Sequence, residues 1–239
     1  MPALHVRVRT LCLSALLCTF VSAANADMVL DRSILVFDAD AGRQDVEVTN
    51  TGDDNLYLNT EILTVRDPGT QQEARVSVED PDAVGVLVTP ARMVVPPGGR
   101  QLVRIVLLEE PAATDRIFRI NLVPVVAPLE AEATAVKVIV AYQLLVIVRP
   151  ENPQPQLEWT RDGTRITFAN SGNSNVLLYG GIQCPPGTEP GGEGGAACVE
   201  LGVARRLYAG NSWTLELPFD APVDFTTTVG VENVRRRFE

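Results

Sequence analysis

The feature that most constrains the fold of this chain is a valine-rich stretch at residues 133–150. Its density of β-branched side chains predicts a strand rather than a helix, and it is about three times as long as an ordinary strand. One face of this strand would be wholly apolar, with Val136, Val138, Val140, Tyr142, Leu144, Val146 and Val148. The opposite face would be largely apolar, with Lys137, Ile139, Ala141, Gln143, Leu145, Ile147 and Arg149. Because a sheet with one face in water alternates cleanly between apolar and polar residues, something must cover the second face.

Three structures compete for this stretch. A membrane-spanning helix is disfavoured, because Lys137, Tyr142 and Gln143 interrupt the run and valine has a low helix propensity. A central strand that is buried on both faces is compatible with the pattern. So is a long apolar edge strand kept for pairing with another chain, since proteins normally protect such edges with charge, proline or a bulge.

Residues 1–26 have the pattern of a cleaved export signal. Arg7 and Arg9 precede an apolar run at residues 11–21 that is too short to span a bilayer, and a small-residue cleavage motif follows at residues 24–26. We therefore expect an exported protein that begins at Asp27. The formal net charge of the whole chain is −10, and loss of the two arginines makes it more negative. This charge argues against nucleic acids and anionic membrane surfaces as partners.

Few chemistry-bearing residues remain after residue 26. Cys12 and Cys18 leave with the signal, so Cys184 and Cys198 form an even pair in an oxidising compartment, which favours a disulfide over a zinc site. The only histidine, His5, is also removed, and with it the commonest general base and metal ligand. We expect no catalytic residue, no metal site and no cofactor.

Up to residue 124 the chain alternates short β-prone runs with turn residues. We expect strands at residues 28–37, 46–48, 56–65, 84–88, 101–108 and 116–124, with the acidic stretch 71–82 as a solvated connection. Together with the valine-rich stretch these runs make seven strands, which is typical of an immunoglobulin-like sandwich.

The composition changes at residues 150–155, where Pro150, Pro153 and Pro155 predict a short, stiff linker. Further β-prone runs follow at residues 157–160, 165–169, 175–179, 198–201, 206–208, 212–217 and 224–231. They predict a second, smaller all-β module. The expected division is thus a signal at 1–26, a first domain at 27–149, a linker at 150–155 and a second domain at 156–239.

A series of short motifs stands in a fixed order after the export signal. They are Leu30-Asp31-Arg32 with Val36-Phe37, Val48-Thr49-Asn50, Thr89-Pro90 with Pro97-Gly98, Val103-Arg104-Ile105, residues 118–122, and Arg149-Pro150. In this order and spacing the motifs resemble those of the PapD-like periplasmic pilus (fimbrial) chaperones. The resemblance covers the whole first domain and the domain junction, and only the general character of the second domain.

The resemblance implies an all-β protein of two immunoglobulin-like β-sandwich domains in an angled, L-shaped arrangement. It also implies a periplasmic chaperone that binds pilin subunits, which lack one strand, by lending its own seventh strand, and that delivers them to an outer-membrane usher. By position, the side chains that line the lent strand are Val136, Val138, Val140 and Tyr142. Such an exchange requires no nucleotide.

The chain departs from the family at one functional position. Family members fix the terminal carboxylate of the pilin with an arginine in the first strand and a lysine in the seventh, whereas the matching residues here are Ile34 and Leu145. Three nearby basic residues could replace this anchor: Arg32, Arg119 and Lys137. Each could equally be a solubilising surface charge. This departure places the chain in a divergent branch of the family.

A second set of charges matches the network with which family members stabilise the domain junction. It consists of Arg104, Asp115 and Arg149. Because exposed ion pairs contribute little free energy, we expect this set to orient the domains rather than to stabilise them.

Two other functions compete with this one. A secreted structural or adhesive sandwich protein would bury the valine-rich strand within its own fold and would bind no subunit. A carboxylate-based glycosidase does not need histidine, but no motif supports one. The sequence does not identify the pilin.

Overall fold

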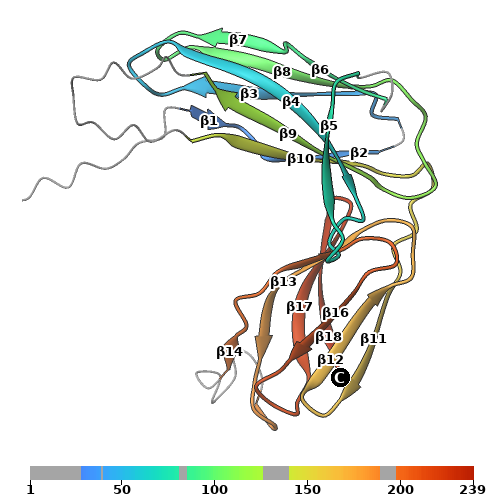
Figure 1. Cartoon of the computed structure of the whole chain (residues 1–239). Coiled ribbons are helices and arrows are strands. Elements are labelled where there is room, and N and C mark those ends of the chain that lie inside the picture. The colour runs from blue at the N-terminus through green and yellow to red at the C-terminus, as the bar shows by residue number, and fades with distance from the viewer. Residues whose placement is uncertain (1–27, 39, 81–84, 126–139, 189–197) are drawn as a thin grey trace, which may run out of the picture.

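The computed structural model describes residues 28–38, 40–80, 85–125, 140–188 and 198–239 (Figure 1). These residues form strands, turns and irregular segments, with no helix among them, and so no helix that could cross a membrane. The strands build two β-sandwiches set at an angle to each other. The predicted fold, two immunoglobulin-like sandwiches in an angled arrangement, is confirmed. The expected signal at residues 1–26 lies outside the described residues.

The first sandwich consists of sheets A and B. Sheet A has the order β1 (Met28–Leu30), β3 (Arg43–Asn50), β8 (Arg100–Leu107) and β6 (Val86–Thr89). Sheet B has the order β2 (Ile34–Phe37), β10 (Tyr142–Val148), β9 (Arg116–Pro124), β4 (Leu56–Arg66) and β5 (Ala74–Val78), and β7 (Arg92–Val95) also pairs with β4.

The alternation of apolar residues along these strands creates the core between the two sheets. Val46 and Val48 of β3, with Val103 and Ile105 of β8, face inward from sheet A and are fully buried. From sheet B the buried residues include Ile120 and Leu122 of β9 and Leu144, Val146 and Val148 of β10. Thus one face of the valine-rich strand belongs to the interior of the first sandwich.

The first expected strand, at residues 28–37, is two strands in two different sheets. β1 pairs antiparallel with β3, whereas β2 pairs parallel with β10. Asp31 lies between them, and its Oδ1 accepts a hydrogen bond from the backbone N–H of Glu47 (2.8 Å), which ties the crossing segment to β3. The apolar run had no turn signal strong enough to predict this crossing.

The acidic stretch at residues 71–82, expected as a solvated connection, is in part a strand. β5 pairs with the end of β4 from Ile62 to Arg66. Four of its five residues are exposed, so β5 buries little side-chain area and shows no clear hydrophobic signal. The ladder bonds to β4 hold it in place.

The second sandwich consists of sheets C and D. Sheet C has the order β11 (Leu157–Asp162), β12 (Arg165–Asn170) and β16 (Ser212–Glu216). Sheet D has the order β14 (Val199–Glu200), β13 (Val176–Gln183), β17 (Val223–Val229) and β18 (Glu232–Phe238), and β15 (Arg205–Leu207) also pairs with β13. Aromatic rings fill the core, with Phe168 in edge-to-face contact with Phe225 and Phe238.

The predicted disulfide between Cys184 and Cys198 is confirmed. It joins the end of β13 to the residue before β14 across a sequence separation of 14. Cys184 is buried against the second sandwich. The bond therefore closes a loop at the edge of sheet D.

The proline-rich segment between the sandwiches is hydrogen-bonded to the second of them. Asn173 Oδ1 accepts from the backbone N–H of Gln154 (2.6 Å), and the backbone N–H of Asn173 donates to the carbonyl of Gln154 (3.0 Å). The side-chain amide of Asn173 also donates to the carbonyl of Asn152 (3.1 Å). These bonds add to the stiffness that the prolines give this segment.

Removal of the disulfide should destabilise the second sandwich. In the Cys184→Ala/Cys198→Ala variant we expect the free energy of unfolding to fall by roughly 3 kcal/mol, because the unfolded chain regains the entropy of an open loop. Urea unfolding followed by tryptophan fluorescence measures this, since Trp159 and Trp213, the only tryptophans, both lie in the second sandwich. An unchanged urea midpoint would contradict the expectation.

Candidate functional site

The strand β10 is covered along only part of one backbone edge. Its pairing with β9 runs from Tyr142 to Val148, but its pairing with β2 begins only at Leu145. There the backbone N–H of Leu145 donates to the carbonyl of Ser33 (2.9 Å). Among the described residues no strand pairs with this edge at residues 142–144. β10 is thus an interior strand near the second sandwich and an edge strand at its far end.

The four residues predicted to line the lent strand lie at or before this open end. Val136 and Val138 are outside the described residues, as is Lys137. Val140 lies two residues before β10 and is 44% exposed. Tyr142 begins the strand and packs against the core of the first sandwich.

The second apolar face of β10 is covered at its other end by the second sandwich. Leu145 and Ile147 are buried in a cluster with Val65 and Ile117 of the neighbouring strands and with Tyr208, which follows β15. The doubly apolar pattern therefore has two causes. One face fills the first sandwich, and the other forms the junction between the two sandwiches.

The positions that correspond to the family's usual anchor form one row across sheet B. Leu145 pairs with Ile34 on one side and with Arg119 on the other. Since paired residues point to the same face of a sheet, Arg119 shares a face with the two apolar replacements and lies directly beside Leu145. Of the three basic candidates, this register places Arg119 next to the anchor position.

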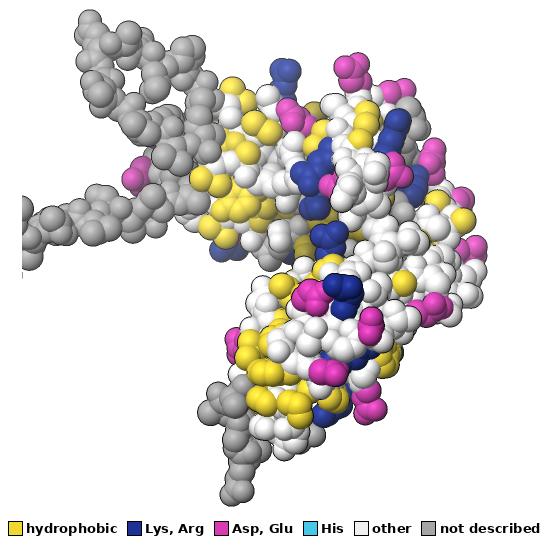
Figure 2. Space-filling model, turned by 60° about the horizontal axis from the view of Figure 1, so that its bottom comes forward, with side chains coloured by type: hydrophobic (Ala, Val, Ile, Leu, Met, Phe, Trp, Pro, Cys, Tyr) yellow, Lys and Arg dark blue, Asp and Glu magenta, His cyan; other side chains and the backbone are white. Residues whose placement is uncertain are grey.

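Arg119 is held close to the second sandwich. Its Nε atom is buried and has no hydrogen-bond partner among the described residues. Burial raises the pKa of Tyr208, while the positive charges of Arg206 and Arg119 act to lower it. Burial likewise lowers the pKa of Arg206, and Arg119 lowers it further. Figure 2 shows arginine side chains gathered where the sandwiches meet. The junction therefore brings two guanidinium groups, one from each sandwich, to a single tyrosine.

Arg32, the third candidate anchor, lies between β1 and β2. Its Nε pairs with Asp31 Oδ2 at 2.9 Å, and its side chain is 52% exposed. This placement is that of a surface ion pair.

Two of the three residues expected in the charge network, Asp115 and Arg149, contact the same segment of the second sandwich. Asp115 accepts hydrogen bonds from Ser174 Oγ (2.9 Å) and from the backbone N–H of Asn175 (2.6 Å). Arg149 Nη1 pairs with Asp38 at 2.6 Å, and its Nε donates to Ser174 Oγ (3.4 Å). Ser174 and Asn175 precede β13, so both charged residues contact the second sandwich. Arg104 instead pairs with Asp45 across sheet A (2.9 Å).

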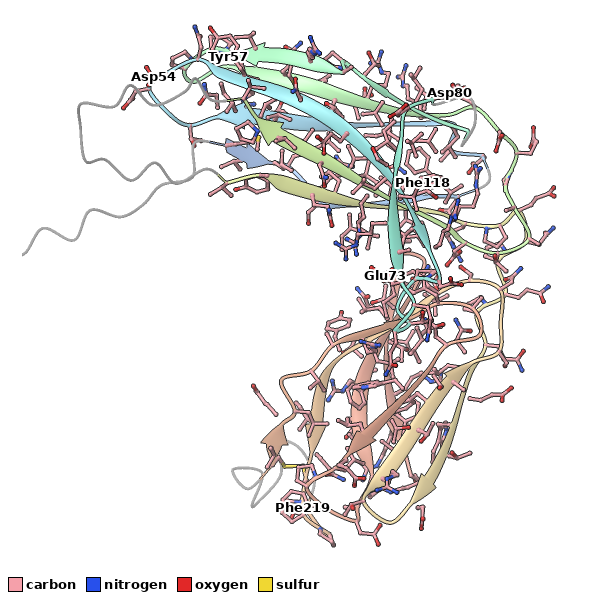
Figure 3. All side chains as sticks on the ribbon, viewed as in Figure 1. Asp54, Tyr57, Glu73, Asp80, Phe118 and Phe219 are labelled. Atoms are coloured by element: carbon pink, nitrogen blue, oxygen red, sulfur yellow. A yellow bond between two sulfur atoms is a disulfide. The ribbon has the colours of Figure 1, made fainter. Side chains whose placement is uncertain are left out.

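The turn between β4 and β5 makes a further contact with the second sandwich that the sequence does not predict. The carbonyl of Pro68 accepts from the side-chain amide of Asn211 (2.7 Å), and the carbonyl of Gly69 accepts from Arg205 (3.0 Å). A Cβ atom on Gly69 would lie 2.9 Å from Asn211 Nδ2 and 3.1 Å from the ring of Tyr208, and Gly69 has a φ of +75°. Figure 3 places Glu73 of this turn between the sandwiches. The residues Asp67-Pro68-Gly69 are typical of a turn after the expected strand at residues 56–65, but nothing in the sequence indicates what this turn contacts.

Beyond the anchor row, the outer face of sheet B becomes polar. The side-chain amide of Gln143 donates to Asn121 Oδ1 (2.7 Å), and Arg75 Nη1 reaches Gln143 Oε1 (3.4 Å). No group of side chains among the described residues could hold a metal ion. The site thus offers an open backbone edge, a half-buried guanidinium group and polar side chains.

The PapD N-terminal domain model of the pili and flagellar-assembly chaperones matches residues 27–154. No curated protein sequence matches the chain.

Solved structures of similar fold cover nearly the whole chain. A chain of the Salmonella enterica SafA pilin complex with the SafB chaperone matches with a TM-score of 0.63 at 14% identity, over 91% of this chain and 98% of that one. The class 5 fimbriae chaperone CfaA matches at 0.62 and 18% identity, over 88% and 98%. The periplasmic chaperone SfaE matches at 0.58 and 12% identity, over 88% and 98%. At these identities the likeness shows the fold.

The turn at Gly69 should make the stability of the chain depend on pH. The backbone N–H of Gly69 donates to Glu73 Oε2 (2.8 Å) and, with Arg75, holds the pKa of Glu73 below its ordinary 4.5, although desolvation opposes this. A carboxyl with a lowered pKa contributes stability that is present above its unfolded value and is lost as the pH falls through its folded value.

We therefore expect wild type to be more stable than Glu73→Gln near neutral pH. The difference should shrink between about pH 5 and pH 3. Thermal unfolding followed by circular dichroism across this range measures it, and Glu151→Gln, at an exposed position, controls for the loss of one carboxylate. A difference that stays constant with pH would contradict the assignment to Glu73.

Proposed function

The chain belongs to the family of pili and flagellar-assembly chaperones, and we propose that it holds pilin subunits in the periplasm by lending them a strand and then passes them to an outer-membrane usher. The observation that carries this proposal is the half-covered edge of β10. An unpaired edge that continues an apolar strand can add to the sheet of another chain.

The lent segment would consist of the residues before β10. Val136, Val138 and Val140 share one face, and in an unfinished pilin sandwich they would occupy the place of the missing strand. Burial of each side chain is worth roughly 1.5–3 kcal/mol, an upper bound because association also orders both partners. Backbone hydrogen bonds from the open edge would fix the register.

We assign the carboxylate anchor to Arg119. Arg119 lies directly beside Leu145 and on the same face as Ile34, the residues at the usual anchor positions, and its buried Nε is an unused donor. A buried donor without a hydrogen-bond partner is costly, and a carboxylate that reached the guanidinium would form a strong, charge-assisted bond. Arg32 is already paired with Asp31, which makes it the weaker candidate.

The remaining features fit a binding protein. The proposed exchange makes and breaks only non-covalent contacts, so it requires no catalytic residue, cofactor or nucleotide. The periplasmic location is supported by the signal-like pattern of residues 1–26, by the disulfide and by the likeness to a periplasmic chaperone.

Placing a charge on the lent strand should abolish subunit binding. In co-expression with a pilin from the same genome, Val138→Asp and Val140→Asp should each remove the pilin from the complex on a size-exclusion column, because each would place a carboxylate in the interior of the pilin. Leu102→Asp is the matched control, since Leu102 is 49% exposed on sheet A, away from the edge. Retention of the pilin by both edge variants would overturn strand donation.

The anchor is tested with a peptide that copies the terminal strand of that pilin. Replacing Arg119 by Gln should weaken binding by about 2 kcal/mol, or roughly 30-fold, and amidating the peptide's terminal carboxylate should do the same. The two changes should not add, because they remove the same bond. Calorimetric titration measures this, with Arg32→Gln as control. Additive losses, or a loss with Arg32→Gln alone, would exclude Arg119.

A further inference from the structure

The last strand of the chain, β18, is a basic edge that sequence analysis did not predict as a strand. It pairs with β17 from Glu232 to Phe238, and no described residue pairs with its other side. Its first six residues are exposed. They include Arg235, Arg236 and Arg237 in a chain whose formal net charge is −10.

The arginines of this edge lie on both faces of sheet D. Arg236 pairs with Phe225, and Val234 with Thr227, so these two side chains share the inner face with the buried Phe238. Arg235 and Arg237 share the outer face. Val234 is nevertheless 53% exposed, because nothing among the described residues closes the sandwich above it.

The facing edge of sheet C is equally open. β11 pairs only with β12 among the described strands, and Trp159 on it is 37% exposed. The ring of Trp159 meets that of Phe238 edge to face, with centroids 6.0 Å apart. The guanidinium of Arg236 lies 5.4 Å from the centroid of the Phe238 ring. Thus β18 and β11 border one open side of the second sandwich, lined by aromatic rings and by a cation.

Arg235 keeps hydrogen-bonding capacity for a ligand, while Arg237 lies across the ladder from Asp224 of β17. Arg235 donates through Nη1 to the carbonyl of Gly180 (2.6 Å) and to Thr226 Oγ1 (3.4 Å). A guanidinium carries five N–H donors, so the Nε and Nη2 groups of Arg235 remain available. A row of arginines repels a second basic strand and attracts carboxylates. The charge of this edge therefore favours acidic strands as partners for its unpaired backbone groups.

We propose that the open side between β18 and β11 binds an extended acidic segment of a partner protein, which adds as a strand to sheet D. Alternate residues of such a strand would lie about 6.8 Å apart. Its outward positions would place carboxylates beside Arg235 and Arg237. Its inward positions would place apolar side chains over Val234 and Trp159. The expected ligand therefore alternates acidic and apolar residues, and this site is independent of the edge of β10.

A capped peptide of about eight residues of alternating glutamate and valine is the probe. Calorimetric titration into the full chain should show saturable binding that weakens about tenfold in Arg235→Gln/Arg237→Gln. The control variant is Arg100→Gln/Arg165→Gln, which also removes two exposed arginines and should bind as wild type. Circular dichroism establishes that each variant is folded.

Two altered peptides separate strand addition from simple charge attraction. A peptide of the same composition with its glutamates in one block should bind at least about tenfold more weakly. A peptide whose alternate amides are N-methylated should lose binding, because it cannot form ladder bonds to β18. Equal binding of either altered peptide, equal weakening by both double variants, or no binding of the alternating peptide would overturn the proposal.

Discussion

The packing of Tyr208 against the outer face of β10 is the interaction on which the rest of the structure depends. The same strand supplies Leu144, Val146 and Val148 to the interior of the first sandwich and Leu145 and Ile147 to the junction. A strand buried on both faces at one end is held firmly there. Its other end, from Leu144 back to Tyr142, can then remain unpaired on one side without loss of register.

Polar contacts orient this junction more than they stabilise it. Asp115 receives its hydrogen bonds from the segment before β13, and Arg149 reaches the same segment while pairing with Asp38. Exposed ion pairs are screened by solvent, but bonds of fixed direction still select one relative placement of two rigid bodies. The apolar cluster around Tyr208 stabilises the junction by burying apolar surface. The hydrogen bonds determine the angle between the two sandwiches.

The sequence predicted most strands in which buried apolar side chains alternate with exposed polar ones. The alternating runs gave most strands, and the parity of the remaining cysteines predicted the bond between Cys184 and Cys198. It missed β5, β7 and β18. β5 and β18 are largely exposed edge strands whose stability comes from backbone pairing, and β7 is only four residues long, between Pro90 and Pro96. The surroundings of Arg119 could not be predicted from the sequence either, because Tyr208 and Arg206 belong to the second domain and come near Arg119 only when both domains are folded. A sequence pattern shows which side chains of a strand are buried, but it does not show which loop of one domain contacts the other domain.

The turn at Pro68 and Gly69 has a mechanical consequence for the whole molecule. The sandwiches are joined covalently through the proline-rich segment and, at a separate place, by the bonds from Asn211 and Arg205 to this turn. A single covalent joint would let the two sandwiches rotate freely, whereas contacts at several separate places, here also those of Asp115 and Arg149 with the segment before β13, oppose rotation about any one axis. The elbow of this protein is therefore braced rather than hinged.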